Sequence, residues 1–298
     1  MEYSQRSSFK NTPKSTKDKR SDYLFGVTLV VISAMLFSSA GIFTKGVVAG
    51  SWEVIFWRGA FAAVFTIVWI IWRGTLVKNF ARMGASGLAV AIIGAMGTAA
   101  FIAAFKFTTI ANVSLIYAAS PLLAALIAWL WIGEPISRQV VMGCLGAILG
   151  VAIVVGGSFN NLNLTGDILA LLMTAALALI MVIYRRYPNT PAAGPMALSS
   201  LILLPVSFFL GTPLIIETSE IIALAAFGLV FAIASVTLAE GSKHIPPGEA
   251  ALLSILETPV APLLAWLIFT EIPADTTFMG GALILAAVIG TQVSRKRS

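Results

Sequence analysis

Charged residues are scarce in this sequence. Lys, Arg, Asp and Glu make up 11% of its 298 residues, whereas hydrophobic residues make up 58%, and the mean hydropathy is +0.95. A water-soluble domain carries about 25% charged residues, because its surface must be solvated. The shortage excludes a soluble globular protein of this size and predicts an all-α integral membrane protein with much of its surface in lipid.

Cysteine and histidine are almost absent as well. The single Cys144 excludes an intrachain disulfide. The sequence has no HExxH, CxxC, Walker A or GxGxxG motif, so we expect no cofactor, no metal and no nucleotide-driven mechanism. One feature favours an enzyme: "GASG" at 84–87 has the G-x-S-G form of rhomboid intramembrane proteases, and Ser86 could pair with His244. A rhomboid-like intramembrane serine protease is therefore kept as a distant alternative to a protein that is not an enzyme.

Long apolar stretches dominate the rest of the chain. A helix needs about 20 apolar residues to cross the ~30 Å hydrocarbon core of a bilayer. This criterion predicts ten transmembrane helices separated by short polar or turn-forming segments. The expected spans are 23–44, 52–72, 84–105, 110–132, 138–156, 166–184, 194–212, 220–241, 248–269 and 275–293.

Positive charge is concentrated on one side of this arrangement. Of the 19 Lys and Arg residues, 16 fall on the side of the chain ends. Because cytoplasmic loops are enriched in Lys and Arg, both termini are expected in the cytoplasm. The same placement argues against a nucleic-acid partner. Segment 1–21 is expected to be a disordered basic cytoplasmic tail, and 295–298 a second basic tail.

A sequence segment near the middle of the chain is repeated, with changes, 137 residues later. "AWLWIGEPISRQVVMG" in the first half corresponds to "AWLIFTEIPADTTFMG" in the second. The repeat predicts two five-helix units, 22–156 and 157–294. Because five is odd, the second unit must enter the membrane from the opposite side, so the repeats are inverted. Inverted repeats are typical of transporters that work by alternating access.

The motifs around this segment resemble those of a known superfamily. They are "GEP" at 133–135, the following "GCLGAILGVAIVVGG", and the degenerate copy "TEIPADTTFMGGALILAAVIG". With the five-plus-five layout, they resemble the drug/metabolite transporter superfamily in its EamA-type ten-helix branch, over residues 22–294. The whole chain is most similar to bacterial exporters of aromatic and other hydrophobic amino acids (the YddG type). The resemblance implies a central cavity between the halves, with helices 5 and 10 at the periphery.

Polar residues expected deep in the membrane are the candidate site. Ser254 and Glu257 share one face of the ninth expected helix. The repeat-related positions in the fourth helix are Tyr117 and Ser120, and both sets lie beside a proline, which frees a backbone carbonyl. Ionisable groups in the bilayer usually face an interior cavity. Glu257 is predicted to bind a substrate ammonium or a coupling proton; the alternative is a carboxylate satisfied by a neighbouring helix.

Two further residues complete the predicted site. Arg58, in the second helix, either anchors a substrate carboxylate or extends to the outer surface. Phe101, in the third, either lines an apolar cavity or packs between helices. A phosphorylated substrate would need several deep cations, and the sequence offers Arg58 at most. Neutral or zwitterionic, partly apolar solutes therefore fit better.

Two other patterns have a functional and a structural interpretation. Glu134 and Glu271 either form gates, with Arg138 or another base, or are solvated carboxylates in turns. The small residues Gly146 and Gly150 serve either dimerisation or, more commonly, packing within the chain.

These observations together predict a secondary transporter of the bacterial inner membrane. It would export aromatic or other hydrophobic amino acids and related small metabolites by alternating access. The alternative within the same superfamily is a multidrug or lipophilic-cation exporter. The expected partners are a small-molecule substrate and membrane lipid, and the sequence leaves monomer and homodimer open.

Overall fold

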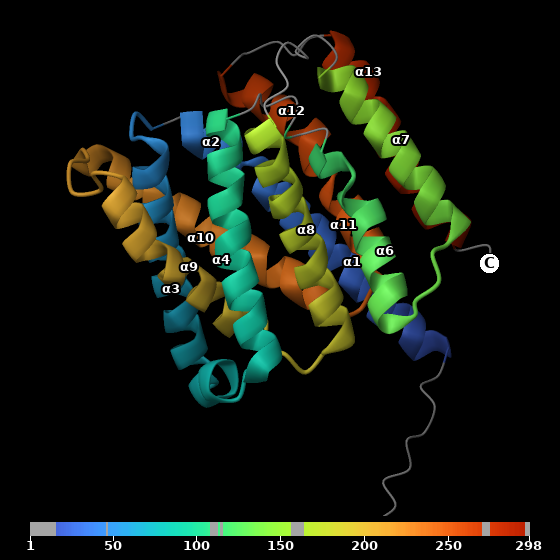
Figure 1. Ribbon diagram of the computed structural model, residues 1–298, viewed down its shortest axis with the longest axis horizontal. Coiled ribbons are helices and arrows are strands. Elements are labelled where there is room, and N and C mark those ends of the chain that lie inside the picture. Colours follow the sequence, from blue (N-terminus) through green and yellow to red (C-terminus); the bar gives the residue numbers. More distant parts are fainter. Residues whose placement is uncertain are drawn as a thin grey trace, which may run out of the picture.

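The computed structural model describes residues 16–45, 47–107, 113, 116–155, 164–269 and 275–295. Within these ranges the protein is helical and contains no strand, and its connections alternate between the two ends of one bundle (Figure 1). The elements are α1 (Thr16–Ser38), α2 (Ala40–Lys45), α3 (Ser51–Trp72), η1 (Val77–Ala81), α4 (Gly84–Phe107), α6 (Ser120–Ile132), α7 (Arg138–Val155), α8 (Leu164–Arg186), α9 (Ala193–Leu210), α10 (Thr218–Gly241), α11 (Pro247–Ser254), α12 (Glu257–Phe269) and α13 (Asp275–Arg295).

The described helices agree with the ten predicted crossings. Six of them, α1, α3, α4, α8, α9 and α10, contain segments long and apolar enough to span a membrane. Shorter apolar helices lie at Ser120–Ile132, Arg138–Ile153 and Phe278–Thr291. α11 and α12 together form the ninth crossing, because only two residues separate them. α1 begins at Thr16, so the last part of segment 1–21, predicted to be a disordered tail, is helical.

Helix packing repeats when the two halves are exchanged. α1 packs on α10 as α8 packs on α4, and α3 packs on α10 as α9 packs on α4. α3 also packs on α9, and α7 on α13, so that each of these pairs joins equivalent helices of the two halves. With five crossings in each half, this reciprocity is the packing that inverted repeats produce.

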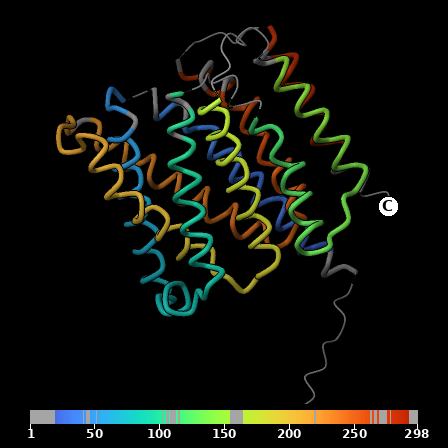
Figure 2. Tube along the Cα trace, in the orientation of Figure 1, coloured from blue at the N-terminus to red at the C-terminus, as the bar shows by residue number. Residues whose placement is uncertain are grey.

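The α7–α13 pair is held by small residues. A side chain at Gly143 would meet Thr291, one at Gly146 would meet Ala287, and one at Gly150 would meet the backbone of α13. Such contacts let two helices approach closely in a membrane. Figures 1 and 2 show the pair at one edge of the bundle. The small residues therefore serve packing within the chain.

The centre of the bundle is built around α11. All eight residues of this short helix are buried, and it packs against α1, α6, α7 and α8. The surrounding core is rich in alanine, including Ala34, Ala124, Ala250 and Ala251. Small side chains here allow helices of both halves to meet near the bundle axis.

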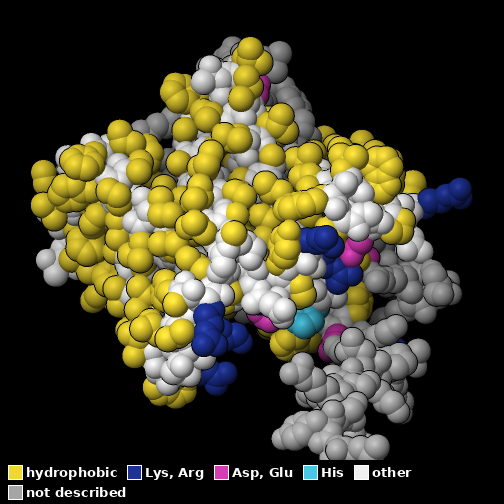
Figure 3. All heavy atoms as spheres, turned by 60° about the horizontal axis from the view of Figure 1, so that its bottom comes forward, with side chains coloured by type: hydrophobic (Ala, Val, Ile, Leu, Met, Phe, Trp, Pro, Cys, Tyr) yellow, Lys and Arg dark blue, Asp and Glu magenta, His cyan; other side chains and the backbone are white. Residues whose placement is uncertain are grey.

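The outer surface is largely apolar, and charge gathers at one end. Figure 3, turned so that the end at which α1 begins comes forward, shows hydrophobic side chains over most of the visible face and Lys and Arg side chains in separate groups at the lower left and on the right. The last described residues of α13 lie toward this same end in Figure 1. We call it the terminal end and the other the far end.

Candidate functional site

Two of the crossings are broken at equivalent positions. α6 begins at Ser120 after a turn at Ala119, and α12 begins at Glu257 after α11 has ended. These first residues are 137 positions apart, which is the spacing of the sequence repeat. Pro121 and Pro259 follow them closely. Proline lacks the N–H that a continuous helix needs and its ring clashes with the preceding turn, so a break is expected here.

The backbone tightens at both breaks. The Ala119 N–H donates to the Ile116 carbonyl at 3.1 Å, and the Leu256 N–H donates to the Leu253 carbonyl at 3.1 Å. Both bonds span three residues rather than the four of an α-helix. Discontinuous helices that meet inside a membrane expose unpaired backbone groups, and substrate and ion sites of transporters are commonly built there.

A polar pair joins the two halves at these breaks. The Tyr117 hydroxyl donates a hydrogen bond to the Glu257 carboxylate. Tyr117 comes from the first half and Glu257 from the second. Both side chains lie deep in the protein, yet both residues keep part of their accessible surface. The structure thus brings together two of the six predicted site residues, and the partner of Glu257 is a neutral donor.

The two serines of the predicted site behave differently. Ser120 is 0% exposed, and its hydroxyl oxygen has no hydrogen-bond partner among the described residues. The Ser254 hydroxyl donates to the Ala250 carbonyl, 3.0 Å away in its own helix. Ser254 and Glu257 do not belong to one continuous helix as predicted, because α11 ends at Ser254 and α12 begins at Glu257; that they share one face stays a prediction.

Arg58 points into the protein rather than to its surface. Its Cζ lies 4.2 Å from the centre of the Phe231 ring and 5.6 Å from that of Phe227. Phe231 lies near the middle of α10, so the guanidinium does not extend to the far end of the bundle. Among the described residues, Arg58 and Glu257 form no ion pair with each other or with another residue.

Phe101 is not part of the packed core. Its side chain is 40% exposed, in the last third of α4. Nothing described places it beside Tyr117 or Glu257, so its role in the site stays a prediction.

At the terminal end, an ion pair links the halves. The Arg185 Nε donates to Glu134 Oε1 at 2.7 Å, with both side chains a little under a third exposed. Glu134 follows Gly133, which ends α6 in the left-handed conformation at φ +70°. Arg185 lies in the last turn of α8 and also donates to the Lys243 carbonyl at 3.4 Å. Glu134 therefore pairs with Arg185 rather than with Arg138, and Glu271 lies outside the described residues.

A second contact between the halves lies close by. The Tyr23 hydroxyl of α1 donates to Glu249 Oε2 of α11 at 2.8 Å, and Glu249 is 5% exposed. Between the two contacts is a cavity of about 340 Å³. Its lining includes Glu134, Arg185 and Glu249, with Ala125 and Ala128 of α6 on its apolar side. These contacts fasten the two halves together around the cavity.

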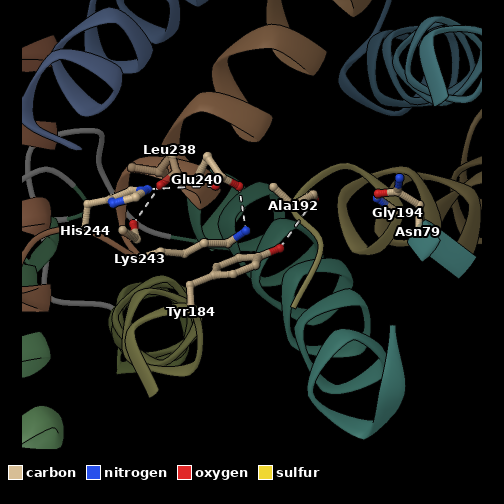
Figure 4. A network of polar contacts seen from close by, with 9 residues as sticks. Asn79, Tyr184, Ala192, Gly194, Leu238, Glu240, Lys243 and His244 are labelled. Carbon is tan, nitrogen blue, oxygen red and sulfur yellow. Dashed lines mark hydrogen bonds and ion pairs between the residues drawn. The ribbon is translucent and has the colours of Figure 1, made fainter. Parts of the chain in front are cut away.

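Further polar contacts surround the terminal end (Figure 4). Lys243 Nζ lies 2.5 Å from Glu240 Oε2, and His244 Nε2 lies 3.9 Å from Glu240 Oε1. Asn79, in η1, accepts a hydrogen bond from the Gly194 N–H at 3.1 Å. This bond ties the connection between α3 and α4 to the start of α9, so it also joins the halves.

The predicted protease dyad is absent. The Ser86 hydroxyl oxygen lies 2.7 Å from that of Thr190, whereas His244 lies beside Glu240 and against the Phe25 ring. Two residues that do not face each other cannot transfer a proton in catalysis. The Ser86/His244 prediction is wrong, because each residue is held by a different neighbour.

The sequence matches one family twice. Residues 24–156 and residues 164–292 each match the EamA-like transporter family. The chain belongs to this family. The family has two repeated domains, so the fold of ten helices in two inverted five-helix repeats is confirmed, and its members are transporters rather than enzymes.

The relatives of the chain are transporters too. It is 25% identical over 249 residues to the uncharacterized transporter YyaM of Bacillus subtilis, covering 78% of this chain and 81% of that protein. It is 24% identical over 281 residues to the pseudopaline exporter CntI of Pseudomonas aeruginosa, covering 91% and 97%. A crystal structure of a protein with 20% identity superposes with a TM-score of 0.75 over 93% of this chain and 98% of that one. These relatives support membrane transport and export, and they do not single out aromatic amino acids.

Proposed function

We propose that this transporter exports aromatic and other hydrophobic amino acids, and related small metabolites, across a bacterial inner membrane by alternating access. The observation that carries the proposal is the Tyr117–Glu257 pair, in which each half supplies one side chain at its helix break. A site made by both halves changes its access when the halves exchange conformations. The pair therefore lies where an alternating-access carrier needs its substrate site.

The chemistry of the pair favours a substrate that carries an ammonium group. A carboxylate in a membrane interior is costly unless a cation or strong donors stabilise it. Among the described residues, Glu257 has the Tyr117 hydroxyl and no basic partner. A substrate ammonium would supply the missing charge. The apolar composition of the surrounding helices suits a hydrophobic side chain on the same substrate.

We place the terminal end of the bundle in the cytoplasm. This end carries the Lys and Arg clusters of Figure 3, and such clusters are retained on the cytoplasmic side of membranes. The Glu134–Arg185 and Tyr23–Glu249 contacts fasten the halves at this end. In this orientation the conformation is closed to the cytoplasm, and the cavity of about 340 Å³ between the contacts is the remnant of the inward-facing vestibule.

Counterflow in proteoliposomes tests the proposal directly. Vesicles loaded with unlabelled phenylalanine, leucine or methionine should accumulate the same labelled amino acid transiently, whereas vesicles loaded with glutamate should not. Tetraphenylphosphonium is the probe for the alternative. Counterflow of this cation without counterflow of any hydrophobic amino acid would contradict the proposal and favour a lipophilic-cation exporter.

A further inference from the structure

Arg58 is a deep cation that has no acidic partner among the residues that the structure describes. It lies in α3, whose ends are at the two ends of the bundle, and it is half-buried in the protein. Among the described residues it forms neither an ion pair nor a hydrogen bond. A charge in the membrane interior normally pairs with an opposite charge or lines a functional path. The lack of a partner therefore needs an explanation.

The guanidinium lies over aromatic rings. Arg58 Cζ is 4.2 Å from the centre of the Phe231 ring and 5.6 Å from that of the Phe227 ring. The rings are themselves fixed: Phe231 meets Phe37 of α1 edge to face at 5.8 Å, and Phe227 stacks on Phe43 of α2 at 5.1 Å. The ring faces attract the cation and hold its plane in one orientation. They supply no hydrogen-bond acceptor.

The N–H groups at the edge of the guanidinium are available to bind another group. Its Nε is fully enclosed and has no acceptor in the described part of the chain. The two terminal nitrogens also lack a hydrogen bond to any described residue, and they are not enclosed in this way, so they keep accessible surface. An arginine fork with free N–H groups in one plane matches a carboxylate, which accepts two parallel hydrogen bonds. The aromatic rings thus position the terminal N–H groups of Arg58 where they can donate to a carboxylate.

We propose that Arg58 binds the carboxylate of the transported substrate, so that the substrates are zwitterions rather than lipophilic amines. The inference deepens the proposed function: Glu257 and Tyr117 bind the ammonium, and Arg58 adds a second, independent requirement. Two deep charges of opposite sign that are not paired with each other suit a ligand that carries both. The competing interpretation is that Arg58 only braces α3 against α10 through the Phe231 ring.

Binding of three phenyl compounds separates these interpretations. Phenylalanine carries both charges, phenethylamine lacks the carboxylate, and 3-phenylpropionate lacks the ammonium. Their apparent Kd values for purified protein in detergent are measured by ligand-induced thermal stabilisation. For the wild type we expect phenylalanine to bind at least about tenfold more tightly than phenethylamine. Arg58→Met should reduce this ratio to near one and abolish binding of 3-phenylpropionate, with little change for phenethylamine.

Two further variants make the test specific. Arg58→Lys keeps the charge without the planar fork, so it should recover part of the phenylalanine preference and remains informative if Arg58→Met does not fold. Arg73→Met is the matched control, since Arg73 follows the same helix and its Cζ lies 5.8 Å from the Trp69 ring centre, outside the predicted site. Arg73→Met should leave all three Kd values unchanged.

The outcomes are distinct. An unchanged phenylalanine preference in both Arg58 variants, or an equal loss for all three compounds, would overturn the carboxylate assignment and leave a brace between helices. A wild type that binds phenethylamine as tightly as phenylalanine would overturn it too, while leaving export of hydrophobic amines intact. No binding of any of the three compounds would contradict the proposed function itself.

Discussion

The breaks in the fourth and ninth crossings have a similar backbone conformation, and their side chains differ in chemistry. Both tighten through a bond over three residues, and both precede a proline. In the fourth crossing the first residue after the break is Ser120, a buried serine without a hydrogen-bond partner among the described residues; in the ninth it is Glu257. The two copies thus share the shape of the break, and only one copy carries an acid. The single Glu257 carboxylate is sufficient for one site between the halves. A second carboxylate at the equivalent position would repel the first.

The largest effect is expected from removing the chemical difference between the breaks. Glu257→Gln should lower kcat/KM for phenylalanine counterflow by about 100-fold, because losing one charge of a buried charge pair costs about 2–5 kcal/mol. The side chain keeps its size, so folding should be preserved. Glu240→Gln is the matched control, as this glutamate lies at the terminal end beside Lys243, and its rate should change less than twofold. An unaltered rate in Glu257→Gln would remove the acid from the substrate site.

An intermediate effect is expected at the terminal end, where each broken crossing contributes a carboxylate. Glu134 pairs with Arg185, and Glu249 accepts from Tyr23. Arg185→Glu should loosen the closure and speed maleimide labelling of Ala125→Cys in the cavity by about two- to fivefold, since a partly exposed ion pair contributes about 1 kcal/mol or less. The native Cys144 is buried and provides a low background.

The reversed pair is the control for this closure. Glu134→Arg combined with Arg185→Glu should return labelling toward the wild-type rate, because the attraction is restored with its signs exchanged. Labelling by an impermeant maleimide should occur in inside-out vesicles and not in intact cells. Labelling in intact cells would place the terminal end outside, and a reversed pair that labels as fast as Arg185→Glu would show that the ion pair does not hold the closure.

The smallest effect is expected at the apolar break. Ser120→Ala removes a buried hydroxyl that lacks a partner among the described residues, and such a group costs about 1–3 kcal/mol. The variant should melt about 2 °C higher or more in detergent, with phenylalanine Kd changed less than twofold. A tenfold weaker Kd without a higher Tm would instead make Ser120 a substrate ligand, and the two breaks would then share the chemistry.

The sequence was informative where the physics is local or repeated. Apolar length predicted the crossings, and the 137-residue spacing related Tyr117 to Ser254 and Ser120 to Glu257, which predicted polar groups beside a proline in both halves. It failed where a partner comes from a distant element. Nothing near Glu249 in the sequence indicates Tyr23, 226 residues away, and nothing near Glu134 selects Arg185 over the closer Arg138.

Helical periodicity did not predict the position of the break itself. The prediction for Ser254 and Glu257 assumes one continuous helix, whereas two residues outside both helices separate α11 from α12. A proline in a sequence predicts that a helix is disturbed and leaves open where the turn falls. The sequence also left open how deep the Arg58 guanidinium lies. Its long side chain can extend to the interior or to the surface, and the contact with the Phe231 ring of another helix shows that it lies in the interior.

The seam between α7 and α13 has a mechanical consequence. At three successive turns a glycine of α7 lies so close to α13 that not even a methyl group fits between them. One helix of each half is thereby packed tightly on its counterpart, and a sliding movement there would bring side chains and, at Gly150, the α13 backbone into collision. If one half moves relative to the other, the α7–α13 contact is therefore expected to stay fixed. The movement is then expected in the helices that carry the breaks.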